Sequence, residues 1–408
     1  YGQTPVPASD VYGTWDTMGS PYLIEGNITI PNDSTLLVKP GVKVEFQDSY
    51  TMFVQGRIIA QGTESDSIIF TAADTNAGFN SIRFLGTPIE NDTSKFDYCV
   101  FTYGRAHGPY YDNFGGALAF ADFGKIIVDN CRFAYNRAIH QSIVKPGGGA
   151  AIALLRCSPI IRNSIFEYNR GCIGAAVMLS TDSTLLENNI FRYNEAPYFD
   201  DYREGLGGAI FCKWWSHAVI RGNIFHGNHA DVGAGAIYFW NNGNAHVENN
   251  IFYENESGGI GGAMRIDSCS SPTIINNIIV NNIAIEKGGG IDVYFKSNPE
   301  VYNTILWGNT APEGSQLYIT SNDCTPNFYY SDIQGGQSAF GGNPFTGNYI
   351  NCIDDDPLFV ETGEHPYSLT EDSPCIDQGT PDTTGLLLSC WDIIGNCRFW
   401  DGDEDGDT

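Results

Sequence analysis

The stretch that decides the fold is Asn249-Asn-Ile-Phe-Tyr-Glu-Asn255, which returns 27 residues later as Asn276-Asn-Ile-Ile-Val-Asn-Asn282 and again as Asn303-Thr-Ile-Leu-Trp-Gly-Asn309. Related phrases precede it at spacings of 25 to 34 residues. A unit repeated in this way cannot bury its apolar face alone, so the repeat predicts a stack of similar units. The central apolar residues of the series are Phe101, Phe133, Phe166, Phe191, Phe225, Phe252, Ile279, Leu306 and Ile333.

A second phrase, Gly-Gly-Ala or a close variant followed by alternating apolar residues, lies between the copies of the first. The period-two alternation is typical of a strand with one buried face. Gly and Asn punctuate the strands, where the backbone turns through positive φ. The sequence therefore predicts an all-β fold, a single parallel β-helix of about 11 coils with N- and C-terminal caps. The first apolar residues of the second phrase are Leu118, Ile152, Val177, Ile210, Ile237, Met264, Ile291 and Leu317.

One asparagine recurs at the same place in each copy of the first phrase. In a stack of coils these side chains would form a ladder along one turn, a structural role rather than a site. The positions are Asn136, Asn169, Asn194, Asn228, Asn255, Asn282 and Asn309.

Three parts of the chain together resemble the secreted right-handed parallel β-helix repeat proteins of the bacterial cell surface. They are the N-terminal entry from Gly13-Thr-Trp15 to Ile69-Phe-Thr71, the coils above, and a C-terminal exit with Asp356-Pro-Leu-Phe359 and Ser373-Pro-Cys-Ile-Asp377. The resemblance implies a right-handed β-helix at an extracellular or cell-surface location. It implies no single function, because one scaffold can carry many.

The repeat divides the chain into three regions. Residues 1–72 are expected to form an N-terminal cap and the first coils, residues 73–320 the repeats, and residues 321–408 a C-terminal cap with an acidic tail. The longer spacings come from insertions at 104–114, 138–147 and 195–206, all at the same place in the coil. Stacking should therefore bring these loops to one edge of the rod, where function often resides.

The composition excludes several classes of protein. The chain has 408 residues, with 21 Lys+Arg against 48 Asp+Glu and a formal charge of −27. Such a charge disfavours nucleic acid and anionic lipid as partners. No apolar run approaches the roughly 18 residues of a membrane span. Because the chain starts at Tyr1 without Met, it is either a processed mature protein or a trimmed chain. We expect the former, a secreted protein with a processed N-terminus.

The 11 cysteines are an odd number, so at least one has no partner within the chain. We expect some disulfides near the C-terminus, where Cys390 and Cys397 lie close in sequence, and buried free thiols elsewhere. The pairing is open.

Two columns of side chains, at the second and fourth positions of each Gly-Gly-Ala strand, point away from the core, and they change along the rod from small and apolar to aromatic and charged. Aromatic rings beside Arg and carboxylates suit an extended glycan, since rings stack on sugars and guanidinium groups bind carboxylates. The alternative is a cross-strand ladder of structural pairs. The candidate glycan-binding residues are Phe211, Lys213, Tyr238, Trp240, Arg265, Asp267, Asp292 and Tyr294, with Tyr198 and Tyr202 from the third insertion.

Catalysis is an alternative on the same scaffold. β-Helix pectate lyases use stacked Asp ligands for Ca²⁺ and a basic residue, and Asp267, Asp292 and Arg265 would fill these roles here. Hydrolases use paired carboxylates, which Asp200, Asp201 and Glu204 of the third insertion would supply. The local signatures of both families are missing at these positions, so we expect no catalysis.

The acidic tail offers one metal-binding pattern. Asp401, Asp403 and Asp405, followed by Gly406, match the first half of an oxygen-rich Ca²⁺ loop. The chain ends before the loop would be complete. The tail is therefore either a partial Ca²⁺ site or a solvated acidic linker.

The sequence thus favours an extracellular β-helix protein with a structural, adhesive or glycan-binding role. The alternatives are a polysaccharide lyase or glycoside hydrolase acting on an acidic glycan, and a self-assembling fibre subunit joined through the coil ends. Which glycan would bind stays open at this stage.

Overall fold

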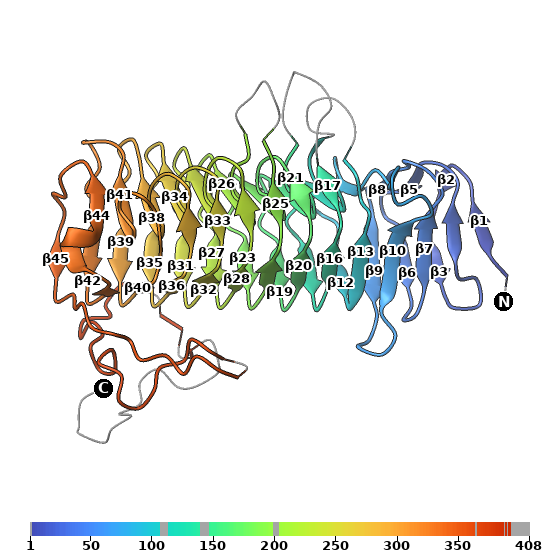
Figure 1. Cartoon of the computed structure of the whole chain (residues 1–408). Coiled ribbons are helices and arrows are strands. Elements are labelled where there is room, and N and C mark those ends of the chain that lie inside the picture. The colour runs from blue at the N-terminus through green and yellow to red at the C-terminus, as the bar shows by residue number, and fades with distance from the viewer. Residues whose placement is uncertain are drawn as a thin grey trace.

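The computed structural model describes residues 2–106, 113–138, 147–198, 204–363, 365–386, 388–389 and 391–392. These residues form one rod of stacked coils, with three long sheets running its whole length (Figure 1). Each sheet has thirteen strands within the described ranges, two more than the expected eleven coils. The extra coils come from both ends, because residues 4–15 and 327–350 also form strands.

Sheet A contains the strands of the Asn-Ile-Phe phrase. They are β1 (Thr4–Val6), β4 (Tyr22–Ile24), β7 (Lys43–Phe46), β10 (Ile68–Ala72), β13 (Cys99–Thr102), β16 (Arg132–Ala134), β20 (Ile165–Glu167), β24 (Ile190–Arg192), β28 (Ile224–His226), β32 (Ile251–Tyr253), β36 (Ile278–Val280), β40 (Ile305–Trp307) and β43 (Asp332–Ile333).

Sheet B contains the strands of the Gly-Gly-Ala phrase. They are β2 (Ser9–Asp10), β5 (Ile28–Ile30), β8 (Met52–Val54), β11 (Ile82–Phe84), β14 (Leu118–Ala121), β18 (Ile152–Leu155), β22 (Val177–Ser180), β26 (Ile210–Lys213), β30 (Ile237–Trp240), β34 (Met264–Asp267), β38 (Ile291–Val293), β41 (Leu317–Ile319) and β44 (Phe340–Gly342).

Sheet C closes each coil. Its strands are β3 (Gly13–Trp15), β6 (Thr35–Val38), β9 (Arg57–Gln61), β12 (Ser94–Asp97), β15 (Ile126–Asp129), β19 (Ile160–Arg162), β23 (Leu185–Glu187), β27 (Val219–Arg221), β31 (His246–Glu248), β35 (Thr273–Ile275), β39 (Glu300–Tyr302), β42 (Asn327–Tyr329) and β45 (Tyr349–Ile350).

A fourth, small sheet follows sheet A in the middle coils. It consists of β17 (Arg137–Ala138), β21 (Arg170–Gly171), β25 (Glu195–Ala196), β29 (His229–Ala230), β33 (Glu256–Ser257) and β37 (Ile283–Ala284). A short 3₁₀ turn, η2 (Gly336–Ala339), lies near the C-terminal end of the rod. Within the described ranges no helix is long and apolar enough to span a membrane.

The parallel pairing keeps equivalent residues in register from coil to coil. Phe211 of β26 pairs with Tyr238 of β30, which pairs with Arg265 of β34. The core is a column of inward side chains, and its centre is a stack of phenylalanine rings. The rings of Phe166 and Phe191 are nearly parallel with centroids 4.7 Å apart, and those of Phe225 and Phe252 are 4.5 Å apart. These are the central apolar residues of the repeated phrase.

The predicted asparagine ladder is confirmed. Nδ2 of Asn228 donates to Oδ1 of Asn255 over 2.9 Å, and Nδ2 of Asn255 donates to Oδ1 of Asn282 over 2.9 Å. Each amide also donates to a backbone carbonyl of a preceding coil, such as that of Phe225 for Asn255. The ladder therefore satisfies polar groups that the turn buries.

The N-terminal end of the rod has short edge strands. The strands β1, β2 and β3 have two or three residues each, and Pro5 lies within β1. Short edge strands and edge prolines are features that disfavour pairing with another chain.

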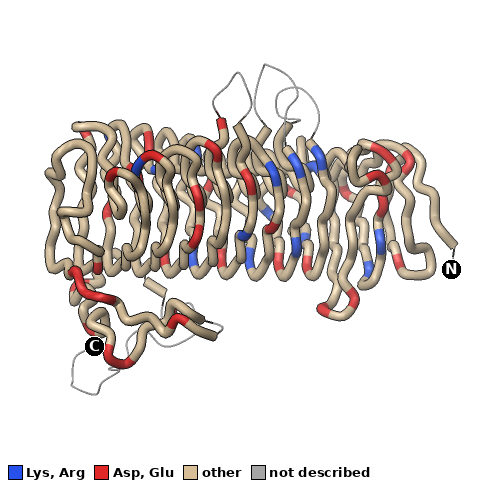
Figure 2. The backbone as a smooth tube through the Cα atoms, in the orientation of Figure 1, with Lys and Arg blue, Asp and Glu red and all other residues tan. Residues whose placement is uncertain are grey.

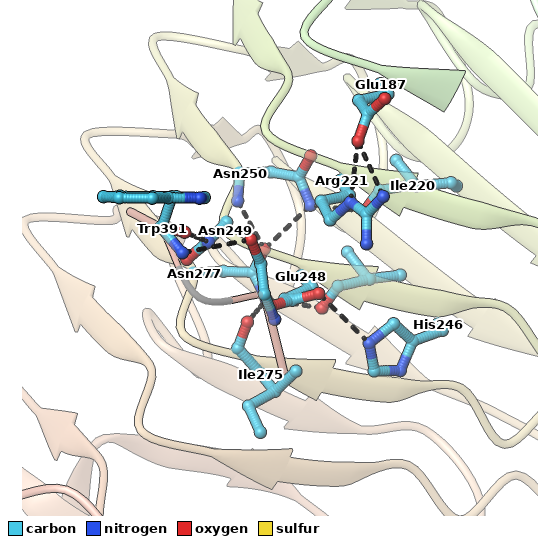
Figure 3. A network of polar contacts seen from close by, with 12 residues as sticks. Glu187, Ile220, Arg221, His246, Glu248, Asn249, Asn250, Ile275, Asn277 and Trp391 are labelled. Atoms are coloured by element: carbon cyan, nitrogen blue, oxygen red, sulfur yellow. Dashed lines mark hydrogen bonds and ion pairs between the residues drawn. The ribbon is translucent and has the colours of Figure 1, made fainter. Parts of the chain in front are cut away.

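Beyond β45 the chain turns back along the rod as a strap, which we define as the described residues of 354–392 (Figure 1). The Thr380 amide donates to Oδ1 of Asn303, and further on the Ser389 amide donates to Oε1 of buried Glu248 over 2.6 Å. Nδ2 of Asn249 donates to the Trp391 carbonyl over 2.9 Å (Figure 3). The strap carries acidic residues and no Lys or Arg, as Figure 2 shows.

Candidate functional site

The outer face of sheet B is where the candidate site lies. In strands β14 to β41 of sheet B the first and third residues enter the main core, as Leu118 and Phe120 of β14 do. The second residues of β18 to β30 belong to a separate cluster outside the core, which includes Met178, Phe211 and Tyr238. The alternation predicted from the sequence is therefore observed.

The outward residues are less exposed than the sequence suggested. Met178 is 2%, Phe211 3% and Tyr238 5% exposed. A second layer of chain packs over them. It is a row of isolated β-bridges between neighbouring coils, in which Ile173 pairs with Leu206 of the next coil. The period-two pattern distinguishes the two faces of a strand, but it contains no information about a second layer packed on the outer face.

The second layer leaves a cleft that extends along sheet B from β11 to β30. The cavity has a volume of about 350 Å³ and mostly apolar walls. Four of the ten predicted glycan-binding residues line it, and each comes from β26 or β30. The lining residues are Arg83, Phe84, Leu85, Phe114, Ala119, Phe120, Ala121, Ala153, Leu154, Leu155, Ile173, Met178, Glu204, Leu206, Phe211, Lys213, Trp214, Tyr238 and Trp240.

Aromatic rings and one ammonium group form one wall of the cleft. The rings of Trp214 and Trp240 are tilted with centroids 6.0 Å apart, and Trp240 also lies 6.3 Å from Phe211. The Lys213 ammonium lies 4.4 Å from the centre of the Trp214 ring and 5.3 Å from that of Phe114. Such a wall offers an apolar face to a sugar ring, beside a cation that is itself only 6% exposed.

Glu204 lines the same cleft and is the one carboxylate among its described lining residues. Burial in these apolar surroundings raises its pKa to about 7. The Lys213 ammonium has the opposite, smaller effect and lowers this pKa. The side chain is therefore close to half-ionised at neutral pH. A carboxyl group with such a pKa can hold a proton, or add a negative charge to the cleft.

Arg265, Asp267 and Asp292 form a buried charge cluster beside the cleft, outside its lining. Nη2 of Arg265 lies 3.5 Å from Oδ2 of Asp267, and Nε lies 3.5 Å from Oδ2 of Asp292. The Thr320 hydroxyl donates to Oδ1 of Asp292 over 2.6 Å. Asp292 is fully buried, and desolvation raises its pKa to about 6 despite Arg265. This geometry matches the cross-strand ladder that the sequence offered as the structural alternative.

Two tyrosines complete this cluster. The guanidinium carbon of Arg265 lies 5.5 Å from the ring centres of both Tyr238 and Tyr294. The Tyr238 hydroxyl donates to Oδ2 of Asp267, whereas Tyr294 is 36% exposed at the surface. Tyr238 therefore connects the charge cluster to the cleft, because its ring lines the cavity.

Of the remaining predicted residues, the structure describes Tyr198 and does not bring it to the cleft. Tyr198 is 40% exposed outside the lining, and its backbone amide donates to Asp231. Tyr202, the hydrolase candidates Asp200 and Asp201, and the tail residues Asp401, Asp403 and Asp405 lie outside the described residues. Within the described ranges no group of three or more His, Cys, Asp or Glu could hold a metal ion.

Sequence reasoning missed two important parts of the cleft. Trp214 follows the Gly-Gly-Ala strand directly, in a turn with positive φ, and the Trp214-Trp215 pair was the available signal. Phe114 belongs to the end of the first insertion. No periodicity applies there, so its place over Lys213 could not be derived.

The cysteine prediction holds in part. Cys99, Cys131, Cys157 and Cys212 are buried thiols, as expected. The C-terminal disulfides are not seen among the described cysteines, since Cys324, Cys352 and Cys375 are free. Sγ of Cys375 instead lies 3.1 Å from Oδ2 of Asp332. Cys390 and Cys397 lie outside the described residues.

Comparison with known proteins agrees with this architecture. The family model described as "Right handed beta helix region" matches residues 19–230 and 174–350, which together cover most of the chain. No curated protein matches the chain. Parallel sheets in register, a continuous core and this match lead to one conclusion: the chain belongs to the right-handed β-helix family.

Proposed function

We propose that this protein is a glycan-binding rod that holds a saccharide in the cleft on sheet B. The observation that carries the proposal is the wall formed by Trp214, Trp240 and Lys213 in a cavity of about 350 Å³. The rings stack on the apolar faces of sugars, while the ammonium group binds a carboxylate or hydroxyl of the ligand. A rigid scaffold keeps both in place.

The wider setting belongs to the same proposal. A long acidic rod that binds an extended glycan suits an extracellular or cell-surface location, with a structural or adhesive role. The formal charge of −27 keeps such a rod soluble.

Glycoside hydrolysis is the second candidate, and Glu204 is the observation that favours it. Its pKa of about 7 suits a general acid. Hydrolysis also needs a partner carboxylate across the bond, and Glu204 is the one carboxylate among the described residues of the lining. Binding without cleavage therefore has the better support.

The test is retention and cleavage of a panel of neutral and acidic polysaccharides, followed with two matched variants. Trp214→Ala removes a cleft ring, and Trp215→Ala removes the next ring, which lies outside the lining. Both tryptophans have positive φ, at 50° and 58°, so the backbone cost is similar. We expect Trp214→Ala alone to weaken retention, by about tenfold for one lost stacking partner.

Two results would contradict the proposal. Equal retention by both variants would place the glycan elsewhere. Release of new reducing ends, abolished by Glu204→Gln, would establish the hydrolase instead.

A further inference from the structure

A second surface, away from the cleft, combines stacked tyrosines with a row of arginines. It lies where the turn after sheet A meets the small sheet. The cavity has a volume of about 310 Å³. It is lined by Thr75, Asn76, Tyr103, Arg105, Tyr135, Arg137, Tyr168, Asn169, Arg170, Tyr193 and Glu195. We call it the Tyr-Arg groove.

The tyrosines form a ladder along the rod axis. The ring centroids of Tyr103 and Tyr135 are 5.9 Å apart, those of Tyr135 and Tyr168 5.4 Å, and those of Tyr168 and Tyr193 5.5 Å. The rings are nearly parallel, so their faces cover one another. Tyr135, Tyr168 and Tyr193 are still 44–45% exposed. The ladder therefore presents ring edges and hydroxyl groups to a ligand.

The arginines lie beside this ladder in neighbouring coils. Arg105 bridges to Arg137, and Arg137 of β17 pairs in register with Arg170 of β21. Equivalent residues of adjacent parallel strands are about 4.8 Å apart, so three like charges stand in a row. Like charges in such positions destabilise a sheet unless counter-charges are present.

The protein itself provides few of those counter-charges. Nη2 of Arg170 lies 3.1 Å from Oε1 of Glu195, at the C-terminal end of the groove. Nη2 of Arg105 donates to the Thr75 carbonyl. Burial and then the Arg137 charge lower the pKa of Arg105, and the Asp74 carboxylate opposes them only in part. Among the described residues Arg137 has no ion pair, and it is exposed. This contrasts with Arg162 and Arg221, each paired with a carboxylate of a neighbouring coil.

The distance between neighbouring arginines in the row can be compared with the repeat distances of different anionic polymers. Side chains on one face of an extended peptide repeat at about 6.7 Å, which is out of step with a coil rise of about 4.8 Å. The phosphates of one DNA strand repeat at about 3.4 Å along a duplex axis. A sugar in an extended polysaccharide advances the chain by nearly one coil, so one anionic group per sugar keeps step with the arginines where successive groups face the same side of the chain.

We propose that the Tyr-Arg groove binds a linear polysaccharide with one carboxylate or sulfate per sugar, lying along the rod axis. The guanidinium groups of Arg105, Arg137 and Arg170 bind the anionic groups. The hydroxyl groups of the tyrosine ladder bind sugar hydroxyls. This site is independent of the sheet B cleft, so either can fail without the other.

The experiment measures binding of alginate, dextran sulfate and neutral dextran to the full chain. Arg137→Glu reverses one charge in the groove, and Arg156→Glu is the matched control, an exposed arginine on another face that pairs with Asp122. We expect Arg137→Glu to weaken binding of an anionic polymer by about tenfold or more, and Arg156→Glu to leave it unchanged. The sulfated and carboxylated polymers together show which anionic group the groove prefers.

Three further measurements sharpen the result. Tyr168→Phe removes one hydroxyl and keeps the stack, and should weaken binding less than Arg137→Glu does. Trp214→Ala, in the sheet B cleft, should leave anionic binding at the groove unchanged. Circular dichroism and thermal unfolding confirm that each variant is folded.

The proposal is overturned if Arg137→Glu and Arg156→Glu bind alike, or if neutral dextran binds as tightly as alginate. Poly-glutamate is the last comparison. If it competes as strongly as alginate, the spacing argument fails and the groove is a site for acidic peptide.

Discussion

The hydroxyl of Tyr238 donates a 2.6 Å hydrogen bond to Oδ2 of Asp267, in the next coil of sheet B. The bond joins the wall of the cleft to the buried charge cluster. Because Tyr238 is 5% and Asp267 5% exposed, water cannot replace a lost partner easily. The Tyr238 ring, 5.3 Å from that of Phe211, is therefore fixed in place from behind.

Tyr238→Phe should destabilise the fold, because it leaves a buried aspartate oxygen without this donor. We expect a loss of about 1–2 kcal/mol in the free energy of unfolding, measured by urea denaturation. Tyr294→Phe is the control, since Tyr294 lies at the same distance from Arg265 but is exposed. An equal loss in both variants would show that the bond to Asp267 is not what matters.

Asp182→Asn should change how stability depends on pH. Burial raises the pKa of Asp182 to about 6, above the value of 3.8 of an exposed aspartate. Between these pH values the folded state keeps a proton that the unfolded state has lost. The free energy of unfolding therefore falls as the pH rises from about 4 to about 6.

In Asp182→Asn this fall should be smaller by about 2–3 kcal/mol, measured by urea unfolding at several pH values. Asp122→Asn should change the pH dependence of stability in the opposite direction. The exposed Asp122 accepts two hydrogen bonds from Arg156, which lower its pKa, so its contribution is present above the ordinary value and lost on acidification. Curves of equal slope for wild type and Asp182→Asn would contradict the prediction.

Glu204 should make binding in the cleft depend on pH. Its pKa of about 7 means that it gains negative charge between pH 6 and 8, close to the Lys213 ammonium. A saccharide that carries a carboxylate should then bind more weakly at pH 8 than at pH 6, and a neutral one equally. In titration calorimetry Glu204→Gln should abolish the difference, and its persistence would assign it to another group.

The asparagine ladder should be a main source of stability. In Asn255→Ala the amide and backbone donors of Asn228 lose their acceptor, and the Phe225 carbonyl loses its donor. All three groups are buried, so we expect a loss of about 3 kcal/mol in the free energy of unfolding. Asn32→Ala, at an exposed turn, should change it by less than about 0.5 kcal/mol. Similar melting temperatures for both variants would refute this role.

The C-terminal part of the strap should loosen when its contact with Asn249 is removed. Asn249 has a φ of 58°, which glycine tolerates, so Asn249→Gly removes the amide without backbone strain. We expect faster hydrogen exchange and proteolysis of residues 376–392. Asn276→Gly is the control one coil away, where φ is 55° and no hydrogen bond to the described strap residues is seen. Equal protection in both variants would mean that other contacts hold the strap.

Much of the fold could be predicted because residues at equal places in the repeat occupy equal places in successive coils. The Phe166, Phe191 and Phe225 stack follows from equal places in the repeated phrase, and the Asn228–Asn255 ladder follows for the same reason. The candidate site was predicted in part. Phe211, Lys213, Tyr238 and Trp240 do line one cleft, because period two places them on one face.

The rest depended on contacts that no period describes. Glu204 and Phe114 come from insertions, so their distances from Lys213 depend on how the chain re-enters the coil. The tyrosines of the Tyr103–Tyr193 ladder belong to the repeated phrase, but the sequence did not predict that they form a surface. Their rings point outward because each tyrosine lies in a turn with positive φ, which strand periodicity does not describe.

By itself the sequence determined the stack, its register and its core, since each coil repeats the same local pattern and neighbouring coils must match. Only the tertiary structure decided which outward residues are accessible. The second layer covers Met178 and Phe211, the strap reaches Glu248, and neighbouring coils bring Arg105, Arg137 and Arg170 into one row. Burial and charge at a surface depend on segments far apart in the chain, and their packing is settled in three dimensions.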